Sequence, residues 1–223
     1  MSNGCSTARS ARTGKGATSR PCRPSPPPNS PNRPLIREES MATVYLVRHG
    51  KAAAAFDEDH DPPLDRIGSR QALVMADLLG PKGPMPLITS PMRRTRETAT
   101  ALENVWGSPA RVEPRVSEVP SPTEDLKARR EWLTGFMEGT WSDPSAADLA
   151  GWRRDLIAAI EEIEEDTVVS SHFVAINTIV GHLTGEDRVT HFRPDNCSVT
   201  VIRRTADGWT LVERGREVET EVL

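Results

Sequence analysis

The chain has 223 residues, of which 36% are hydrophobic and 19 are proline, a composition that fits one domain of ordinary size with a tail. Residues 41–223 contain 21 basic and 30 acidic residues, a net charge of −9, which argues against general nucleic-acid binding. No run of about 18 apolar residues exists, so no membrane span is predicted. The three cysteines, Cys5, Cys22 and Cys197, offer no disulfide framework or zinc-ligand spacing and suit a reducing cytoplasm.

The first 40 residues differ in composition from the rest. They are rich in Pro, Ser and Arg and carry seven basic and two acidic residues, a net charge of +5. Almost nothing there can be buried, so burial cannot offset the entropy of ordering the segment. We therefore expect a disordered N-terminal extension over 1–40 and one domain over 41–223. The simplest account is that translation starts at Met41 or that the extension is dispensable.

A short strand opens the domain. Val44-Tyr45-Leu46-Val47 is a run of apolar or aromatic residues, which is typical of a strand buried on both faces of a parallel sheet. Arg48, His49 and Gly50 follow directly. Because ligands of open α/β sheets bind outside the carboxyl ends of the strands, Arg48 and His49 are expected at the rim of such a crevice. Arg suits phosphate, and His can act as nucleophile or proton carrier.

Two helices are predicted next. Asp65 is a good N-cap for a helix whose apolar face would be Ile67, Leu73, Ala76 and Leu79. A short strand over 86–89 follows, and Ser90 then caps a helix starting at Pro91. The inner face of this second helix would consist of Thr98, Leu102 and Val105.

Strands and helices continue to alternate over the rest of the chain. The predicted elements are an edge strand over 111–116, a loop over 117–122, helices over 123–137 and 145–165, a buried strand over 167–171, a helix over 173–183, and a hairpin of strands 197–203 and 209–213. Glu118 lies in the loop, and His172 directly follows the buried strand. This alternation predicts a single three-layer α/β/α domain with a mainly parallel central sheet.

Three strand-to-helix junctions carry groups that could perform chemistry. The first offers Arg48 and His49, the second puts Arg94 near a helix N-terminus, and the third offers His172. If the strands are neighbours, two guanidinium groups could neutralise a phosphoryl dianion. One imidazole could attack phosphorus while the other holds an equatorial oxygen. The leaving oxygen would need a proton from a carboxylic acid.

Four segments carry a resemblance to a known family. They are Arg48-His49-Gly50, the 61–72 stretch that ends in Gly68-Ser69-Arg70-Gln71-Ala72, Ser90-Pro91-Met92-Arg93-Arg94, and Val168 to His172. In this order and context they resemble the histidine phosphatase superfamily, also called the phosphoglycerate-mutase-like family. The resemblance runs from Thr43 to about Glu213 and implies the phosphoglycerate-mutase-like α/β fold.

The resemblance also implies roles. His49 would accept the phosphoryl group, and Arg48, Arg94 and His172 would bind it, with Arg93 as the alternative to Arg94. Glu118 fits the location of the proton donor. The segment after it is Pro-rich, unlike the family's pattern, so Glu113 and Glu124 stay open as donors. Phe173 stands where a Gly often follows the second His, which narrows that side of the pocket.

We therefore expect a metal-independent phosphomonoesterase that uses a phosphohistidine intermediate, needs no cofactor and acts on a phosphorylated small molecule in the cytoplasm. A phosphoglycerate mutase or a protein-phosphohistidine phosphatase with the same histidine chemistry is the alternative. The acidic stretch over 57–61 lacks the ligand alternation and turn Gly of a calcium loop and is expected to be a solvated or substrate-facing loop. The sequence does not specify the substrate or the oligomeric state.

Overall fold

The computed structural model describes residues 42–55 and 58–217. The predicted extension over 1–40, Met41 and Asp57 therefore lie outside the described residues. None of the described helices is long and apolar enough to cross a membrane.

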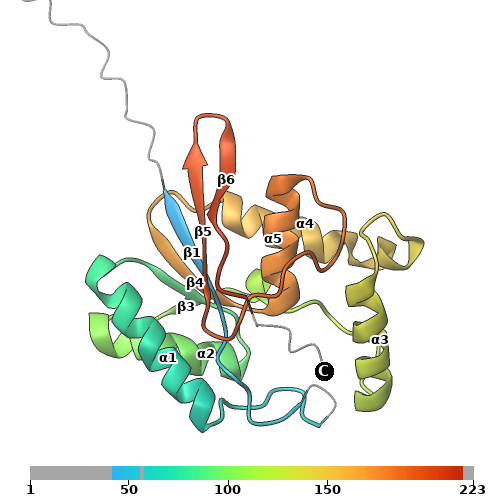
Figure 1. Ribbon diagram of the computed structural model, residues 1–223, viewed down its shortest axis with the longest axis horizontal. Helices are drawn as coiled ribbons and strands as arrows, with labels where there is room; N and C mark the ends of the chain where they lie inside the picture. The colour runs from blue at the N-terminus through green and yellow to red at the C-terminus, as the bar shows by residue number, and fades with distance from the viewer. Residues whose placement is uncertain (1–41, 56–57, 218–223) are drawn as a thin grey trace, which may run out of the picture. The chain divides into compact units, whose positions relative to one another are not determined.

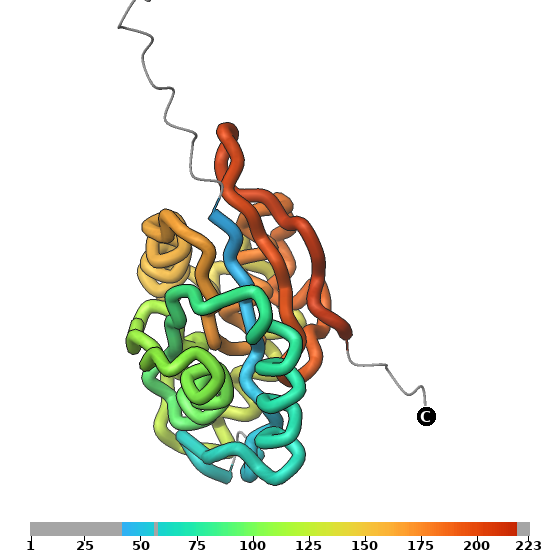
Figure 2. The backbone as a smooth tube through the Cα atoms, turned by 90° about the vertical axis from the view of Figure 1, so that its left-hand side faces the viewer, coloured from blue at the N-terminus to red at the C-terminus, as the bar shows by residue number. Residues whose placement is uncertain are grey.

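A six-stranded mixed sheet forms the middle of the fold, in the order β3-β2-β4-β1-β5-β6. The strands are β1 (Thr43–Arg48), β2 (Leu87–Thr89), β3 (Arg111–Val112), β4 (Thr167–Ser171), β5 (Val199–Thr205) and β6 (Gly208–Glu213). β3, β2, β4 and β1 are mutually parallel. The β5–β6 hairpin lies beside β1 (Figure 2), and β5 is antiparallel to both β1 and β6. The predicted mainly parallel sheet and its hairpin are confirmed. The edge strand predicted over 111–116 is wrong in length: it covers only Arg111–Val112, because Pro114 begins a 3-10 turn.

Helices cover both faces of this sheet (Figure 1). They are α1 (Arg66–Leu79), α2 (Arg93–Trp106), α3 (Leu126–Glu138), α4 (Ala150–Glu161) and α5 (Phe173–Thr184), with short 3-10 turns at Gly80–Lys82, Pro114–Val116 and Pro144–Leu149. Val47 and Val168 pack with α1 and α2, whereas Leu46 and Val169 pack with α4 and α5. Because successive strand residues point to opposite faces, both faces carry a core, and the three-layer prediction is confirmed.

Local sequence signals set several helix ends. The Asp65 side chain accepts a hydrogen bond from the Gly68 N–H, as expected of an N-cap. Gly185 ends α5 in the left-handed conformation, with φ 69°. The predicted helix over 145–165 is shorter: a 3-10 turn precedes α4, which ends at Glu161. The helix after Ser90 begins at Arg93, two residues later than predicted.

Two predicted apolar faces were partly wrong. On α1, Ile67 and Leu73 are exposed, and the buried stripe contains Ala72, Met75, Ala76 and Leu79. Leu73 is about 100° around the helix from the buried Ala72, and α1 turns its small residues inward because it packs closely against α2. On α2, Val105 is also exposed, whereas Thr98 and Leu102 are buried.

Cys197 was predicted inside a strand. It instead precedes β5 and adopts a positive φ of 55°, and its side chain is only partly buried. A left-handed conformation is uncommon for a residue with a Cβ, so contacts with the surrounding chain must hold Cys197 in it.

Candidate active site

The three parallel strands that carry the predicted groups are neighbours, in the order β2-β4-β1. Their carboxyl ends therefore meet at one edge of the sheet, where Ser90 follows β2, His172 follows β4, and Arg48 ends β1 with His49 directly after it. α2 begins just after β2 and adds Arg94. The structure thus brings together His49, Arg48, Arg94 and His172, four of the predicted site residues.

His49 is fixed at both ring nitrogens. Its Nδ1 lies 2.8 Å from the Gly50 carbonyl oxygen, which can only accept, so Nδ1 carries the proton. Its Nε2 accepts from Arg94 Nε at 3.2 Å. Burial lowers the pKa of His49 to about 3, and the charges of Arg94 and Arg48 act in the same direction. The imidazole is therefore neutral at pH 7, with the Nε2 lone pair on the side of Arg94.

His172 is completely buried, 5.3 Å from His49 between ring centroids. Its Nδ1 lies 3.2 Å from Arg94 Nη2, which can only donate, so the proton is on Nε2 and points to Ser90 Oγ at 2.8 Å. Burial lowers the pKa of His172, and Arg94 lowers it further. Both histidines thus present an unprotonated nitrogen to one guanidinium group.

The two arginines are poorly compensated. Arg94 is 5% exposed, and its nearest carboxylate in the described chain is Asp61, 3.8 Å away. Arg48 forms no ion pair with the described residues; its Nη1 donates to the Pro194 carbonyl, its Nε is buried without a partner, and its guanidinium lies 5.1 Å from the Phe173 ring centre. Buried charge is costly unless paired, so this arrangement favours an anion.

The alternative Arg93 is placed elsewhere. Its side chain is exposed and pairs with Glu97, one turn further along α2, at 2.8 Å. It does not line the cavity described below.

Glu118 reaches the same site from the loop after β3. Its carboxylate accepts hydrogen bonds from Val174 N and Ala175 N in the first turn of α5, and from Val119 N. Burial raises the pKa of Glu118, and the backbone hydrogen bonds and Arg94 offset only part of this effect. The carboxyl group therefore keeps its proton to a higher pH than an ordinary Glu.

Neither of the other two candidate acids lies in this position. Glu113 binds Arg111 and Arg115, and the Arg115 hydrogen bonds are the main cause that lowers its pKa to about 2. The Glu124 side chain is 97% exposed. Of the three, only Glu118 lines the cavity.

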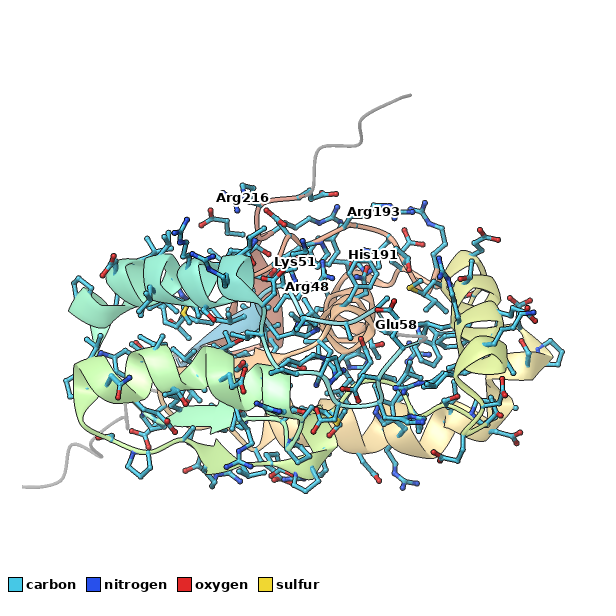
Figure 3. All side chains as sticks on the ribbon, turned by 90° about the horizontal axis from the view of Figure 1, so that it is seen from below. Arg48, Lys51, Glu58, His191, Arg193 and Arg216 are labelled. Atoms are coloured by element: carbon cyan, nitrogen blue, oxygen red, sulfur yellow. The ribbon has the colours of Figure 1, made fainter. Side chains whose placement is uncertain are left out.

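Four of the predicted site residues line a cavity of about 680 Å³. Arg48, His49, Arg94 and Glu118 belong to its lining, as do side chains of the 51–62 segment and Leu133 and Met137 of α3. In Figure 3, Arg48 and Lys51 lie between α1 and α2 on one side and α3 on the other. The volume is typical of a small-molecule site. Phe173 also lines the cavity.

The Gly-x-x-Gln-Ala stretch holds the backbone beside His49. A Cβ on Gly50 would lie 2.6 Å from the Gly68 carbonyl oxygen, and a Cβ on Gly68 would overlap the Lys51 carbonyl oxygen. Gln71 Oε1 accepts from Lys51 N at 2.9 Å. The backbone of α1 at Gly68 therefore contacts the backbone of Gly50 and Lys51 directly, and only glycine at positions 50 and 68 permits this close approach.

Replacing Gly68 with Ala is expected to destabilise the protein by about 1–3 kcal/mol or more, because neither backbone can move away from the new methyl group. Urea unfolding would measure the loss. Gly135→Ala is the matched control: that glycine lies in α3 with open space around it, so Ala there should stabilise by roughly 0.5–1 kcal/mol. A Gly68→Ala protein as stable as wild type would contradict the contact.

Three contributing residues were missed by sequence reasoning. Ser90, predicted only as a helix cap, contacts His172 through Oγ. Thr98, predicted only for the inner face of α2, accepts from Gly50 N at 3.0 Å. Asn196, for which no motif gave a signal, donates from Nδ2 to the His49 carbonyl at 2.8 Å. In the described part of the chain, no group of three or more His, Cys, Asp or Glu residues is arranged to hold a metal ion.

The chain is similar to known proteins over most of its length. Residues 44–216 match the family model of the histidine phosphatase superfamily, branch 1. The chain is 27% identical over 200 residues to a protein named probable phosphoglycerate mutase GpmB, from Yersinia enterocolitica, covering 78% of this chain and 93% of that protein. The resemblance seen in the sequence motifs is therefore confirmed.

Solved structures share the fold. A mycobacterial glucosyl-3-phosphoglycerate phosphatase complexed with VO3 superimposes with a TM-score of 0.61 at 22% identity, covering 78% of this chain and all of that chain. A phosphoglycerate mutase from Bacillus anthracis gives 0.61 at 20% identity, covering 79% and 93%. At these identities the similarity concerns the fold alone, which is phosphoglycerate-mutase-like as expected.

Proposed function

The chain belongs to the histidine phosphatase superfamily, whose members are phosphatases or mutases, and from this premise we propose that it is a phosphomonoesterase that works through a phosphohistidine at His49. One observation carries the proposal. Two inward guanidinium groups with little carboxylate compensation meet at a neutral imidazole whose Nε2 has a lone pair. The two guanidinium groups of such a site can bind a phosphoryl dianion, and its neutral imidazole can act as the nucleophile.

In the first half-reaction, His49 Nε2 attacks phosphorus and the ester P–O bond breaks. Arg48 and Arg94 neutralise the phosphoryl oxygens, and His172, behind Arg94, accepts a hydrogen bond from Arg94 Nη2 through Nδ1 and so positions that guanidinium group. Glu118 gives its proton to the leaving oxygen, so an alcohol departs and not an alkoxide. The raised pKa of Glu118 supports this role, because the acid must still hold its proton near neutral pH.

In the second half-reaction, water attacks phosphorus in line. The Glu118 carboxylate takes a proton from this water, and the P–N bond breaks, which regenerates His49 and releases phosphate. Each group thereby returns to its starting protonation state. No metal ion or cofactor takes part in this scheme.

A phosphoglycerate mutase is the second candidate, because the relative from Yersinia enterocolitica carries that name. A mutase must keep water from the phosphohistidine while the phosphoryl group returns to a second hydroxyl. This chain covers 93% of the phosphoglycerate mutase from Bacillus anthracis, so the two activities are separated by their products and not by chain length.

Product analysis with 3-phosphoglycerate separates the two. We expect free phosphate to form and 2-phosphoglycerate to stay near background, because water reaches the phosphoenzyme. Release of phosphate from several other phosphate esters, measured in parallel, gives the substrate range. Formation of 2-phosphoglycerate faster than phosphate would identify a mutase.

A further inference from the structure

The backbone around Gly50 is held by side chains from three different elements. Thr98 Oγ1 accepts from Gly50 N at 3.0 Å, and Asn196 Nδ2 donates to the His49 carbonyl at 2.8 Å. These two contacts hold opposite sides of the peptide between His49 and Gly50. The next peptide is held by Gln71, which accepts from Lys51 N.

This matters because Gly50 is the acceptor that sets the His49 tautomer. The ring Nδ1–H donates to the Gly50 carbonyl, so the orientation of that carbonyl decides which nitrogen of His49 has the lone pair. Glycine has the widest backbone freedom of any residue. The fixed tautomer therefore depends on contacts that immobilise the peptides on both sides of Gly50.

Thr98 is well placed to do this. It is completely buried, and its hydroxyl donates to the Arg94 carbonyl at 2.7 Å while its oxygen accepts from Gly50. One hydroxyl thus connects the backbone of the phosphate-binding candidate Arg94 with the backbone beside His49. This hydroxyl thereby fixes the backbone positions of Arg94 and His49, the two residues of the contact, relative to each other.

Asn196 belongs to a turn that crosses the end of β1. Pro194 O accepts from Arg48 Nη1, and Cys197 N donates to Arg48 O at 2.9 Å. Asp195 pairs with Arg216 at 2.8 Å, which anchors the turn beyond β6. The positive φ of Cys197 lets consecutive residues of this turn reach both Arg48 and His49. Strained residues of this kind persist where the surroundings hold them, often at functional sites.

We infer that Asn196 and Thr98 are positioning residues that clamp the His49–Gly50 peptide and thereby keep the His49 Nε2 lone pair directed at the substrate. The inference rests on the proposed role of His49 as nucleophile. It assigns a function to the turn over 194–198 and to a buried hydroxyl that no sequence motif indicates.

The test compares Asn196→Ala and Thr98→Val with two matched controls, Asn104→Ala and Thr100→Val on α2. Asn104 is exposed, and the exposed Thr100 makes the same hydroxyl-to-carbonyl bond four residues back, to Arg96 at 3.0 Å, away from the cavity. Single-turnover phosphorylation by 4-nitrophenyl phosphate gives the rate, and ¹⁵N-histidine NMR gives the His49 tautomer, with His49→Gln for assignment.

We expect the clamp variants to phosphorylate about 10- to 100-fold more slowly with KM little changed, and a second His49 tautomer to appear. Thr98→Ser keeps the hydroxyl group, so its phosphorylation rate and its His49 tautomer should match those of wild type. The two control variants should also match wild type. A single, wild-type tautomer in both clamp variants would overturn the inference, as would a rise in KM alone, which would mean substrate contact. If wild type itself hydrolyses no phosphate ester, the proposed function fails, while the tautomer comparison still decides the clamp.

Discussion

Replacing His49 with Ala is expected to reduce kcat/KM for 4-nitrophenyl phosphate by at least about 10⁴-fold, because it removes the imidazole lone pair that lies beside the Arg94 guanidinium group. The His172 ring is fully buried behind Arg94, with Nε2 directed at Ser90, so it cannot replace the missing imidazole. Rapid acid-free quench with ³²P-labelled substrate should trap phosphoenzyme in wild type and none in the variant.

His182→Ala is the control for the loss of an imidazole. His182 is exposed in the last turn of α5 and does not line the cavity, so its removal should leave the rate and the trapped phosphoenzyme unchanged. A His49→Ala protein that hydrolyses the ester at the wild-type rate would rule out the covalent mechanism.

The second large effect is expected at Glu118. Glu118→Gln keeps the shape of the side chain but has no proton to give, so kcat/KM for an alkyl phosphate should fall by about 10²- to 10⁴-fold. For 4-nitrophenyl phosphate, whose leaving group needs no proton, the fall should be much smaller.

The same variant has a pH signature. In wild type, activity should decrease as pH rises through the pKa of Glu118, which burial holds above the usual range for a carboxyl group. The decrease should be absent in Glu118→Gln once ionisation of the substrate is taken into account. Glu124→Gln, at an exposed position, should retain the wild-type profile. An equal loss for both leaving groups would argue that Glu118 only shapes the site.

Much of the fold could be predicted from local patterns. The apolar runs before Arg48 and His172 identified two central strands, and Arg94 was expected near the N-terminus of the helix after another strand, whereas Glu118 was assigned from the resemblance to the family. These predictions succeeded in position because parallel strands bring their carboxyl ends to one edge, whatever the packing details. The roles of these residues stay predictions until the variants above are measured.

What could not be predicted depends on contacts between distant segments. The spacing of Ile67 and Leu73 suggests core residues, but both are exposed. Ala72 and Ala76 are buried instead, because α1 packs closely against α2. Asn196 meets His49 across 147 residues of sequence, and no local pattern reports such a pairing. Ser90 acts on His172 by side-chain geometry that its capping propensity does not reveal.

The position of β1 in the sheet has a consequence for how the protein is made. β1 is the first described strand, yet its two neighbours are β4 and β5, which are synthesised long after it. During translation, its apolar residues and unpaired edges must wait for partners, a condition that slows folding and exposes nascent chains to aggregation. The segment with Arg48 and His49 therefore emerges early from the ribosome but can become a site only after residue 205 has left it.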